Sequence, residues 1–451
     1  MSGKSTKDMT VGSPMKLIIE FAVPMLLGML FQQVYNLVDT MIVGRALGVE
    51  ALAAVGSTGS INFMIIGFCL GVCSGFALPV AQRFGAKDYD GLRKYVGNSA
   101  ILSGIIALIM TVATGLLCNQ ILVWMNTPDD IIGLAYDYIF VIFMGIPATI
   151  LYNMLSGYLR SLGDSVTPLI FLIFSSVLNI GMDLLFILQF HMGVMGAALA
   201  TVIAQGISGV LCLFVVMFKF DILHLNREDW RMDGHHVGVL LGMGLPMGFQ
   251  YSITAIGSVI LQTAVNGLGS TAVASMTTAS KISIFMCCPF DALGSTMATY
   301  GGQNVGAGKL DRLSKGMWSA GILGIIYSVV ILGVLQLWGQ NLVYLFVDTS
   351  EVMVVEQAKQ FLIINAEFYI FLVFVNVVRF LIQGMGYSGF AVFAGVFEMI
   401  ARAFVGMALV PIFGFAAACY ASPFAWVLAD AFLFPAYYFV LHRLKKRMTA
   451  Q

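Results

Sequence analysis

Two aspartates in apolar surroundings, Asp39 and Asp183, are the residues of this sequence best suited to bind an ion. Asp183 follows Asn179 by one helical turn, so these two side chains share a helix face. Thr201, further along the chain, adds a hydroxyl group. Two carboxylates, an amide oxygen and a hydroxyl suit a bound Na⁺, and two neighbouring carboxylates can equally share a proton. We therefore expect cation binding, of either Na⁺ or H⁺, at Asp39, Asn179, Asp183 and Thr201.

The helix that carries Asp39 presents a polar stripe, because Gln32, Tyr35, Asn36 and Asp39 recur at steps of three and four. These side chains are expected to line a cavity beside the ion site. Upstream in the same helix, Pro24 predicts a kink, because proline interrupts the backbone hydrogen bonds of a helix.

The elements that position these residues are predicted to be membrane spans. Of the 451 residues, 59% are hydrophobic and only 10% are charged, against about 25% charged residues in soluble domains. An apolar run of about 20 residues is long enough to cross a bilayer. Such runs lie at residues 15–43, 52–81, 95–118, 131–157, 166–190, 194–218, 237–265, 275–302, 316–339, 358–384, 390–411 and 415–441.

The distribution of Lys and Arg predicts the orientation of these spans. The N-terminus with Lys4 and Lys7, the even-numbered connections and the tail are basic, whereas the odd-numbered connections hold only Arg45 and Lys359. Basic loops stay in the cytoplasm. We therefore expect a multi-pass protein of the plasma membrane with a cytoplasmic N-terminus at residues 1–14 and a cytoplasmic tail at 442–451. On this orientation Asp39, Asp183 and Thr201 lie about 6–12 Å inside the outer boundary.

The chain repeats itself at an offset of about 221–223 residues. Pro24 matches Pro246, and the loop Gln82–Ala86 matches Gln303–Ala307. Each repeat holds six spans, so both copies enter the membrane in the same direction. The predicted fold is all-α, with twelve transmembrane helices in two six-helix lobes related by a pseudo-twofold axis along the membrane normal. The lobes are expected at residues 15–218 and 237–441, joined by a cytoplasmic linker at 219–236.

The repeat also separates a scaffold role from a chemical role for the two acids. Position 39 matches Ile260 or Leu261, and position 183 matches Phe404. Acids that only held the scaffold together would be expected in both repeats. Their absence from the second repeat favours an ion-binding role.

Other ionisable residues within the spans have simpler interpretations. Glu20, Asp137 and Lys281 lie close enough to span ends to reach the interface. Glu398 and Arg402 are four residues apart on one helix face and are expected to pair with each other. With Glu367 they form a candidate second polar group. The ionisable residues counted within the spans are Glu20, Asp39, Asp137, Asp183, Lys281, Asp291, Glu367, Arg379, Glu398 and Arg402.

Several of these segments resemble the multidrug and toxic compound extrusion (MATE) family, and the resemblance covers nearly the whole chain. The matching segments are Pro24 with Gln32–Asp39, Val43-Gly44, Leu47-Gly48 with Ala51–Ala54, Leu159–Asp164, Leu178–Asp183 with Gly193–Ala198, and Gln303–Gly308. The resemblance implies twelve helices in two lobes and the export of drug-like, often cationic compounds, driven by inward H⁺ or Na⁺.

Within that family the sequence is most similar to the DinF-like branch, whose ion site lies in the N-terminal lobe. The resemblance implies ion-site roles for Asp39, Asn179, Asp183 and Thr201, with Tyr35 and Asn153 nearby. NorM-like relatives place acids in the C-terminal lobe, including one on span seven, where this sequence has only Gln250 and Gln262. That difference favours the site in the N-terminal lobe.

The resulting hypothesis is a multidrug antiporter that needs no cofactor, with small organic cations or drugs and the lipid bilayer as its partners, acting as a monomer. A flippase for a lipid-linked substrate is the alternative, although its pyrophosphate would call for more than the few basic residues present. A channel or receptor is a further class. A formal net charge of zero argues against a nucleic-acid partner. We expect no enzymatic activity, because neither a P-loop nor a zinc-protease pattern occurs.

Overall fold

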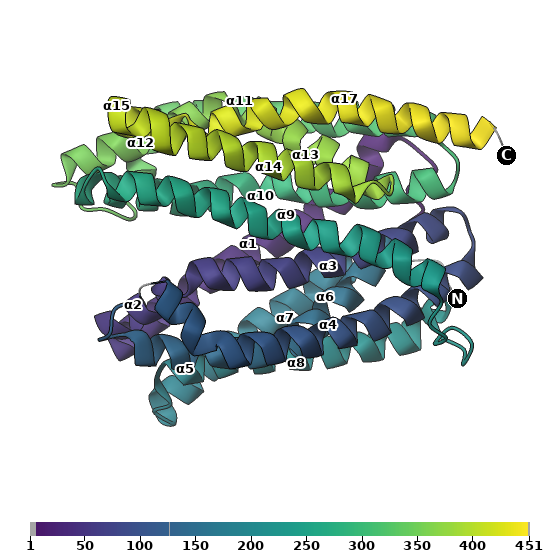
Figure 1. The fold of residues 1–451 in the computed structure, drawn as a ribbon, viewed down its shortest axis with the longest axis horizontal. Coiled ribbons are helices and arrows are strands. Elements are labelled where there is room, and N and C mark those ends of the chain that lie inside the picture. The colour runs from purple at the N-terminus through teal and green to yellow at the C-terminus, as the bar shows by residue number, and fades with distance from the viewer. Residues whose placement is uncertain (1–5, 126, 450–451) are drawn as a thin grey trace. The chain divides into compact units, whose positions relative to one another are not determined.

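The computed structural model describes residues 6–125 and 127–449, and these residues form helices and connecting turns without a strand (Figure 1). The first five residues of the predicted N-terminal tail, including Lys4, and the last two of the predicted C-terminal tail lie outside the described residues. Within the described part, ten helices are long and apolar enough to span a membrane, and two bent helix pairs bring the number to twelve. The predicted all-α fold with twelve spans is confirmed.

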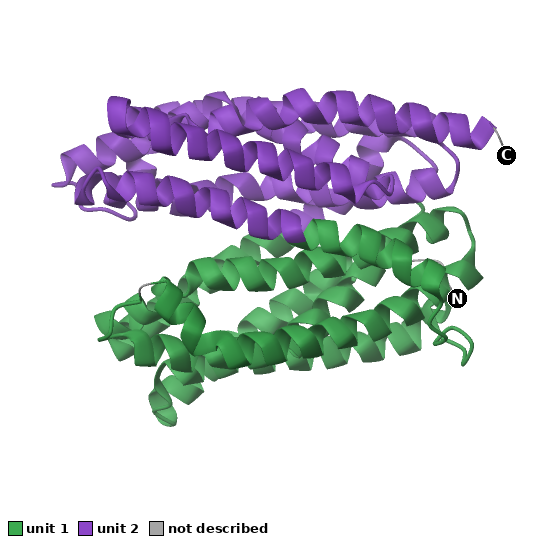
Figure 2. Ribbon diagram, viewed as in Figure 1, with its two compact units in different colours: residues 1–8, 27–248 green, residues 9–26, 249–451 purple. Residues whose placement is uncertain are grey.

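The chain forms two compact units (Figure 2). Unit 1 contains Leu27–Gly248 and the segment that ends at Asp8, and unit 2 contains Met9–Leu26 and the chain from Phe249 onward. The helices wholly within unit 1 are α2 (Val49–Ser57), α3 (Gly59–Gly85), α4 (Tyr89–Trp124), α5 (Ile132–Met144), α6 (Ile146–Ser161), α7 (Val166–Asp183), a π-helix (Leu184–Gln189), α8 (Gly193–Lys219) and a 3₁₀ turn (Asp221–Leu223).

Unit 2 repeats this series of helices. Its elements are α10 (Ser270–Gly306), α11 (Asp311–Val343), α12 (Val352–Glu367), α13 (Tyr369–Gly384), α14 (Ser388–Phe404), a π-helix (Val405–Leu409), α15 (Val410–Phe413), α16 (Phe415–Cys419) and α17 (Ala421–Thr449).

Two long helices are divided between the units. These are α1 (Pro14–Leu47) and α9 (Gly234–Asn266), and each passes from one unit to the other two residues after a proline, Pro24 or Pro246. The sequence analysis assigned these helices to lobes by chain order. Residues 15–26 and 237–248 instead belong to the compact unit formed by the opposite repeat.

Two spans are bent more sharply than the hydropathy pattern indicated. The fourth span breaks by 45° between α5 and α6 at Gly145, and the tenth by 54° between α12 and α13 at Phe368. Several helices also extend beyond the predicted apolar runs. The run at 95–118, for example, lies within α4, whose first turn is capped by Asp88 accepting a hydrogen bond from the Gly91 N–H at 2.9 Å. Hydropathy marks the part of a helix in hydrocarbon, and polar turns continue beyond it.

Each unit is built around one central helix. In the most apolar stretch of α3, 67% of the residues are buried, and in the equivalent stretch of α10 the share is 61%. The next helices, α4 and α11, bury only 28%. Helices with apolar side chains on an outward face are stable where lipid covers them, so α4 and α11 form the periphery of their units.

Glycines bring the first half of α9 into close contact with α3 in unit 1. A Cβ atom at Gly75 would lie 2.5 Å from the Gly244 Cα, and one at Gly71 would lie 2.5 Å from the Met247 carbonyl oxygen. Small residues allow helix backbones to approach one another in a membrane, where van der Waals packing drives helix association. This contact fixes residues 234–248 to unit 1.

The segments that precede α1 and α9 are held by side-chain amides. In unit 2, Gln303 accepts a hydrogen bond from the Met9 N–H at 2.8 Å, and Asn304 donates to the Met9 carbonyl oxygen at 3.3 Å. In unit 1, Asn98 donates to the Arg231 carbonyl oxygen at 3.2 Å and accepts from the Asp233 N–H at 3.1 Å. Buried side-chain amides thus bond to both a backbone N–H and a backbone carbonyl of each segment, and each segment is fixed shortly before its long helix.

The contact between α3 and α9 predicts how two glycine substitutions differ. We expect Gly75→Ala to lower the melting temperature of the purified protein, because the new methyl group meets backbone that cannot move aside, at a cost of about 1–3 kcal/mol. Gly104→Ala in α4 is the matched control, since no atom lies within 4 Å of its Cβ position and alanine favours a helix over glycine. Thermal unfolding in detergent measures both variants, and equal melting temperatures would contradict the packing described.

Candidate ion site

The four residues predicted to bind a cation lie together in unit 1. Asp39 is on α1, Asn179 and Asp183 are on α7, and Thr201 is on α8. The Asp39 and Asp183 side chains are within hydrogen-bonding reach of each other. Asn179 joins the two helices α7 and α8, because its amide nitrogen and the Thr201 hydroxyl oxygen are 3.2 Å apart. We call Asp39, Asn179, Asp183 and Thr201 the acid pair site.

The helix α7 is polar toward the protein and apolar away from it. Its buried side chains include Ser175, Ser176, Asn179 and Asp183, whereas its large apolar side chains, such as Val177, are exposed. This arrangement is the reverse of a soluble helix, and it places the polar face away from lipid. Asp183 is wholly buried and Asn179 is 2% exposed.

The Asn179 amide satisfies both of its ends in one orientation. Its nitrogen then donates to Asp183 Oδ2 at 3.2 Å, while its oxygen accepts from the Thr201 hydroxyl at 3.2 Å and from the Thr201 N–H at 3.0 Å. The assignment follows from the hydrogen-bond network. In this orientation the Asn179 amide donates to Asp183 on α7 and accepts from Thr201 on α8.

The remaining oxygen atoms of the two acids lack donors. Oδ1 of Asp39 and Oδ1 of Asp183 are buried and have no hydrogen-bond partner among the described residues. No Lys or Arg is among the side chains that act on either carboxyl group in the described part of the chain. Two ionised carboxylates in contact repel each other strongly where water is scarce. A proton or another cation between them would remove this repulsion.

Two tyrosines surround the acid pair. Tyr35, one turn before Asp39 on α1, and Tyr138 on α5 both lie within electrostatic range of Asp39 and Asp183. Tyr138 is 8% exposed. The polar stripe on α1 predicted Tyr35, whereas Tyr138 was missed because α5 carries no comparable polar pattern.

The other members of the predicted stripe lie apart from the acids. Gln32 and Asn36 are exposed on α1. The backbone carbonyl oxygen of Asn36 accepts a hydrogen bond from the Thr40 hydroxyl at 2.8 Å. Asn153 on α6 donates to the Thr149 carbonyl oxygen at 2.8 Å. The structure thus brings Tyr35 into the acid pair site and leaves Gln32, Asn36 and Asn153 outside its hydrogen-bond network.

The predicted residues of unit 2 fall into separate places. Gln250 is buried and accepts from Gln383 at 2.7 Å, whereas Gln262 donates to Asn266 at 2.9 Å near the end of α9. Glu367 is exposed at the bend between α12 and α13 and makes no hydrogen bond to Glu398 or Arg402 among the described residues.

The predicted ion pair in α14 is present, because Arg402 donates to Glu398 at 3.3 Å. Glu398 also accepts from Arg379 on α13, which the sequence analysis did not pair with it. Asp430 on α17 is buried nearby. It was missed although the predicted span 415–441 contains it, and a carboxylate within an apolar run is the signal that identifies it.

A π-helix follows the acid pair site directly. It begins at Leu184, one residue after Asp183, and a second π-helix begins at Val405, one residue after the equivalent Phe404. π-helical turns are rare and widen the helix locally. Since the π-helix occurs in both repeats and the acid in only one, the scaffold does not depend on the acid.

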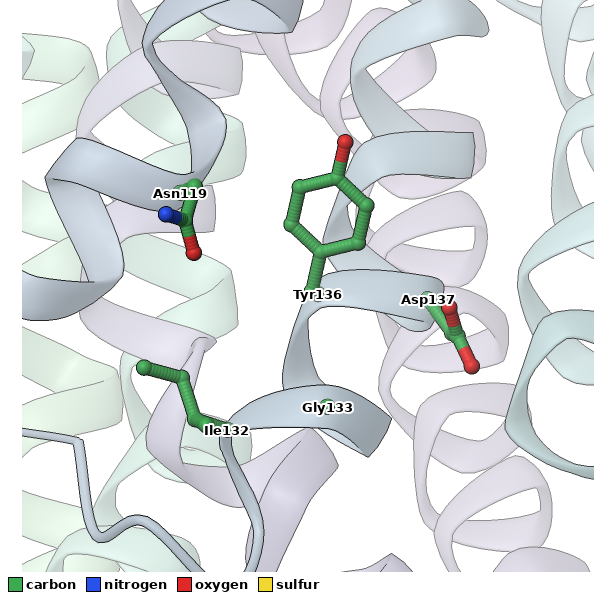
Figure 3. Close-up of a pocket in the computed structure, with 5 residues that line it drawn as sticks. All are labelled: Asn119, Ile132, Gly133, Tyr136 and Asp137. Atoms are coloured by element: carbon green, nitrogen blue, oxygen red, sulfur yellow. The ribbon is translucent and has the colours of Figure 1, made fainter.

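An open groove of about 400 Å³ lies elsewhere in unit 1, between the end of α4 and the start of α5. Figure 3 shows Asn119, Ile132, Gly133, Tyr136 and Asp137 lining it. Asn119 and Asp137 are exposed, and none of the four residues of the acid pair site lines this groove. Asp137 therefore serves as an exposed control for the buried acids.

A family model, related sequences and solved structures all match this chain over most of its length. The MatE family model matches residues 24–185 and 246–408. The "Probable multidrug resistance protein YoeA" of Bacillus subtilis (strain 168) is 30% identical over 347 residues, which are 74% of this chain and 73% of the relative. The "Probable multidrug resistance protein YpnP" of the same strain is 29% identical over 369 residues, 81% of each chain.

Solved structures share the fold over nearly the whole length. A MATE protein crystallised in complex with MaL6 has a TM-score of 0.91 at 23% identity and covers 97% of this chain and 99% of its own. A multidrug resistance MATE family transporter in an outward-facing conformation has a TM-score of 0.91 at 23% identity, with 99% and 100% covered.

The acid pair predicts a cation-dependent stability. We expect the melting temperature of the purified protein to rise when a cation that binds the pair, H⁺ or Na⁺, is supplied, because a ligand at 100 times its dissociation constant stabilises the folded state by about 2.7 kcal/mol. Asp39→Asn should reduce this response, since the variant no longer has two carboxylates to neutralise.

Thermal unfolding in detergent, with pH and NaCl varied separately and choline chloride as the salt control, measures the effect. Asp137→Asn is the matched variant and should respond as the wild type does. A response of full size in Asp39→Asn would show that the cation acts elsewhere.

Proposed function

The chain belongs to the MatE family, and from this membership we propose that it exports small hydrophobic or cationic organic compounds in exchange for H⁺ or Na⁺. The relatives from Bacillus subtilis are named as probable multidrug resistance proteins, which supports the export of several compounds. The geometry of unit 1 supports coupling to a cation. We further propose that the protein lies in the plasma membrane with both termini in the cytoplasm and acts as a monomer.

The observation that carries the proposal is the contact between Asp39 and Asp183. An ionisable residue in the middle of a span costs at least about 2.5–3.5 kcal/mol to insert, and this chain holds two in contact. Neither acid has a basic partner among the described residues. Such a pair is stable when it holds a proton or a metal cation and unstable when it holds neither. Binding of the cation to the pair is therefore linked to the conformation of the helices that carry the two acids.

The coupling ion is a transported substrate in this mechanism. A proton would reside on one carboxyl group and donate to the other, with the Asn179 nitrogen donating to Asp183 in the orientation that satisfies both ends of the amide. Na⁺ would instead favour the opposite amide orientation, in which the nitrogen faces Thr201 Oγ1 at 3.2 Å and the oxygen is free to face the ion. Oxygen ligands of this kind suit hard cations. The two ions therefore differ in the orientation that they impose on Asn179.

Export is driven by the ion gradient and the membrane potential. Each positive charge that enters through a potential of 100 mV releases about 2.3 kcal/mol. The substrate is expected to contact the exposed polar side chains of α1, Gln32 and Asn36, and Asn153 on α6. The binding of the ion by Asp39 changes the charge of the same helix. A change in α1 is thereby coupled to release of the substrate.

Transport by reconstituted protein tests the proposal. In proteoliposomes loaded with an ethidium-like dye, imposed H⁺ and Na⁺ gradients applied one at a time should show which ion drives saturable dye movement. The double variant Asp39→Asn, Asp183→Asn should lose gradient-driven transport, whereas Asp137→Asn should retain it.

Two results would contradict the proposal. A well-folded double variant with full gradient-driven activity would remove the acids from the mechanism. Flux that does not saturate and does not respond to either gradient would indicate a channel instead of an exchanger.

A further inference from the structure

Unit 2 contains a buried group of charged side chains that the proposed exchange at the acid pair site does not use. We call Arg379, Glu398, Arg402 and Asp430 the unit 2 charge cluster. They come from three helices, α13, α14 and α17, which pack against one another. All four are buried, and Asp430 is only 5% exposed. Arg379, Glu398 and Asp430 lie nine or ten residues after the first residue of their helices, and Arg402 lies one turn after Glu398.

Glu398 is the saturated member of this cluster. Its two carboxylate oxygens each accept from a different arginine, Oε1 from Arg379 and Oε2 from Arg402 at 3.3 Å. A carboxylate held by two guanidinium groups is well compensated in a buried site. Glu398 therefore has no need of a further partner.

Asp430 is the unsatisfied member. Both of its carboxyl oxygens are buried and have no hydrogen-bond partner among the described residues. Arg379 lies within electrostatic range of Asp430, and its Nε–H is also without a partner. An ionised carboxylate beside a free guanidinium N–H is expected to bond to it. No such bond is present among the described residues, and a buried charge without a partner is very costly, so a protonated Asp430 fits this arrangement better than an ionised one.

Other groups face the same arginine from neighbouring helices. Tyr251 on α9 and Asp291 on α10 lie within electrostatic range of Arg379, as does Arg402. Asp291 is exposed at the surface of the described residues. One turn beyond Arg379 on α13, Gln383 donates to Gln250 at 2.7 Å. Among the acids around Arg379, Asp430 is the one that is buried and has no hydrogen-bond donor among the described residues.

We propose that Asp430 binds and releases a proton, and that Arg379 is the residue to which its carboxylate pairs when the proton leaves. With the proton bound, the cluster holds two arginines and one carboxylate. On release, the O–H bond of Asp430 breaks, the proton passes to water, and the new carboxylate accepts from the free Nε–H of Arg379. The cluster then holds two positive and two negative groups. This site rests on residues of unit 2 alone and does not depend on the role proposed for Asp39 and Asp183.

The sign of the expected pH effect follows from burial. A carboxyl group that the fold keeps protonated stabilises the protein at low pH, and this contribution is lost as the pH rises. Arg379 opposes that loss by compensating the carboxylate. Removal of Arg379 should therefore move the transition to higher pH, whereas removal of Asp430 should abolish it.

Potentiometric titration of purified protein in nanodiscs, combined with melting temperatures over the same pH range, tests the proposal. Asp430→Asn should release one proton fewer than the wild type and should lose part of the decline in melting temperature with rising pH. Asp311→Asn, an exposed acid at the start of α11, is the control and should leave that decline unchanged.

Arg379→Gln provides the second variant, in which Glu398 keeps Arg402 as a partner. It should release the proton of Asp430 at higher pH than the wild type does. This shift in pH tests the proposal even if Asp430→Asn does not purify as a single species. A proton count in Asp430→Asn equal to that of the wild type, or a shift to lower pH in Arg379→Gln, would overturn the proposal. Dye exchange that depends on Asp39 is measured separately, so failure here leaves the proposed function intact.

Discussion

Repulsion between two carboxyl groups in contact is the constraint on which the proposed mechanism depends. Asp39 and Asp183 approach each other where water is scarce, and no basic side chain of the described residues compensates them. A cation shared between them would remove the repulsion. Asn179 and Thr201 complete the surroundings and connect α7 with α8. Binding of a single charge at this point therefore changes the energy of three helices at once.

The helix that carries Asp39 is also the one that continues into the other unit. Residues 27–47 of α1 belong to unit 1, whereas residues 14–26 belong to unit 2. The division follows Pro24, where the backbone lacks a hydrogen-bond donor and bends more easily. α9 repeats this arrangement at Pro246 but has no acid at the equivalent of Asp39. The duplicated scaffold thus supplies two divided helices, and only α1 carries an acid at this position.

Much of the fold follows from composition and periodicity. The twelve spans were predicted from apolar runs because a bilayer demands about 20 apolar residues per helix, and the resemblance of segments such as Leu178–Asp183 to the MATE family is confirmed by the match of the MatE model. The convergence of Asp39 with Asp183 was predicted from their similar depth in separate spans. Asn179 was placed correctly on the face of Asp183 because residues four apart in a helix share a face.

Other features are not reported by apolar runs alone. The bend at Gly145 precedes Pro147, a local helix-start signal, whereas the bend at Phe368 has no Gly or Pro beside it. The π-helices begin after Asp183 and Phe404, and only the second of them contains a glycine, Gly406. Tyr138 lies in α5 without a polar pattern around it. Apolar periodicity reports which residues avoid water, and it does not report how neighbouring helices meet.

Infrared difference spectroscopy tests the central claim most directly, because protonation of an aspartate changes its carboxyl C=O band. Spectra of the purified protein should be recorded on a change of pH and, separately, on addition of Na⁺. The account predicts a carboxyl signal that responds to one of these ions and that is lost in both Asp39→Asn and Asp183→Asn. The same signal retained at full size in both variants would show that no cation is shared by this pair.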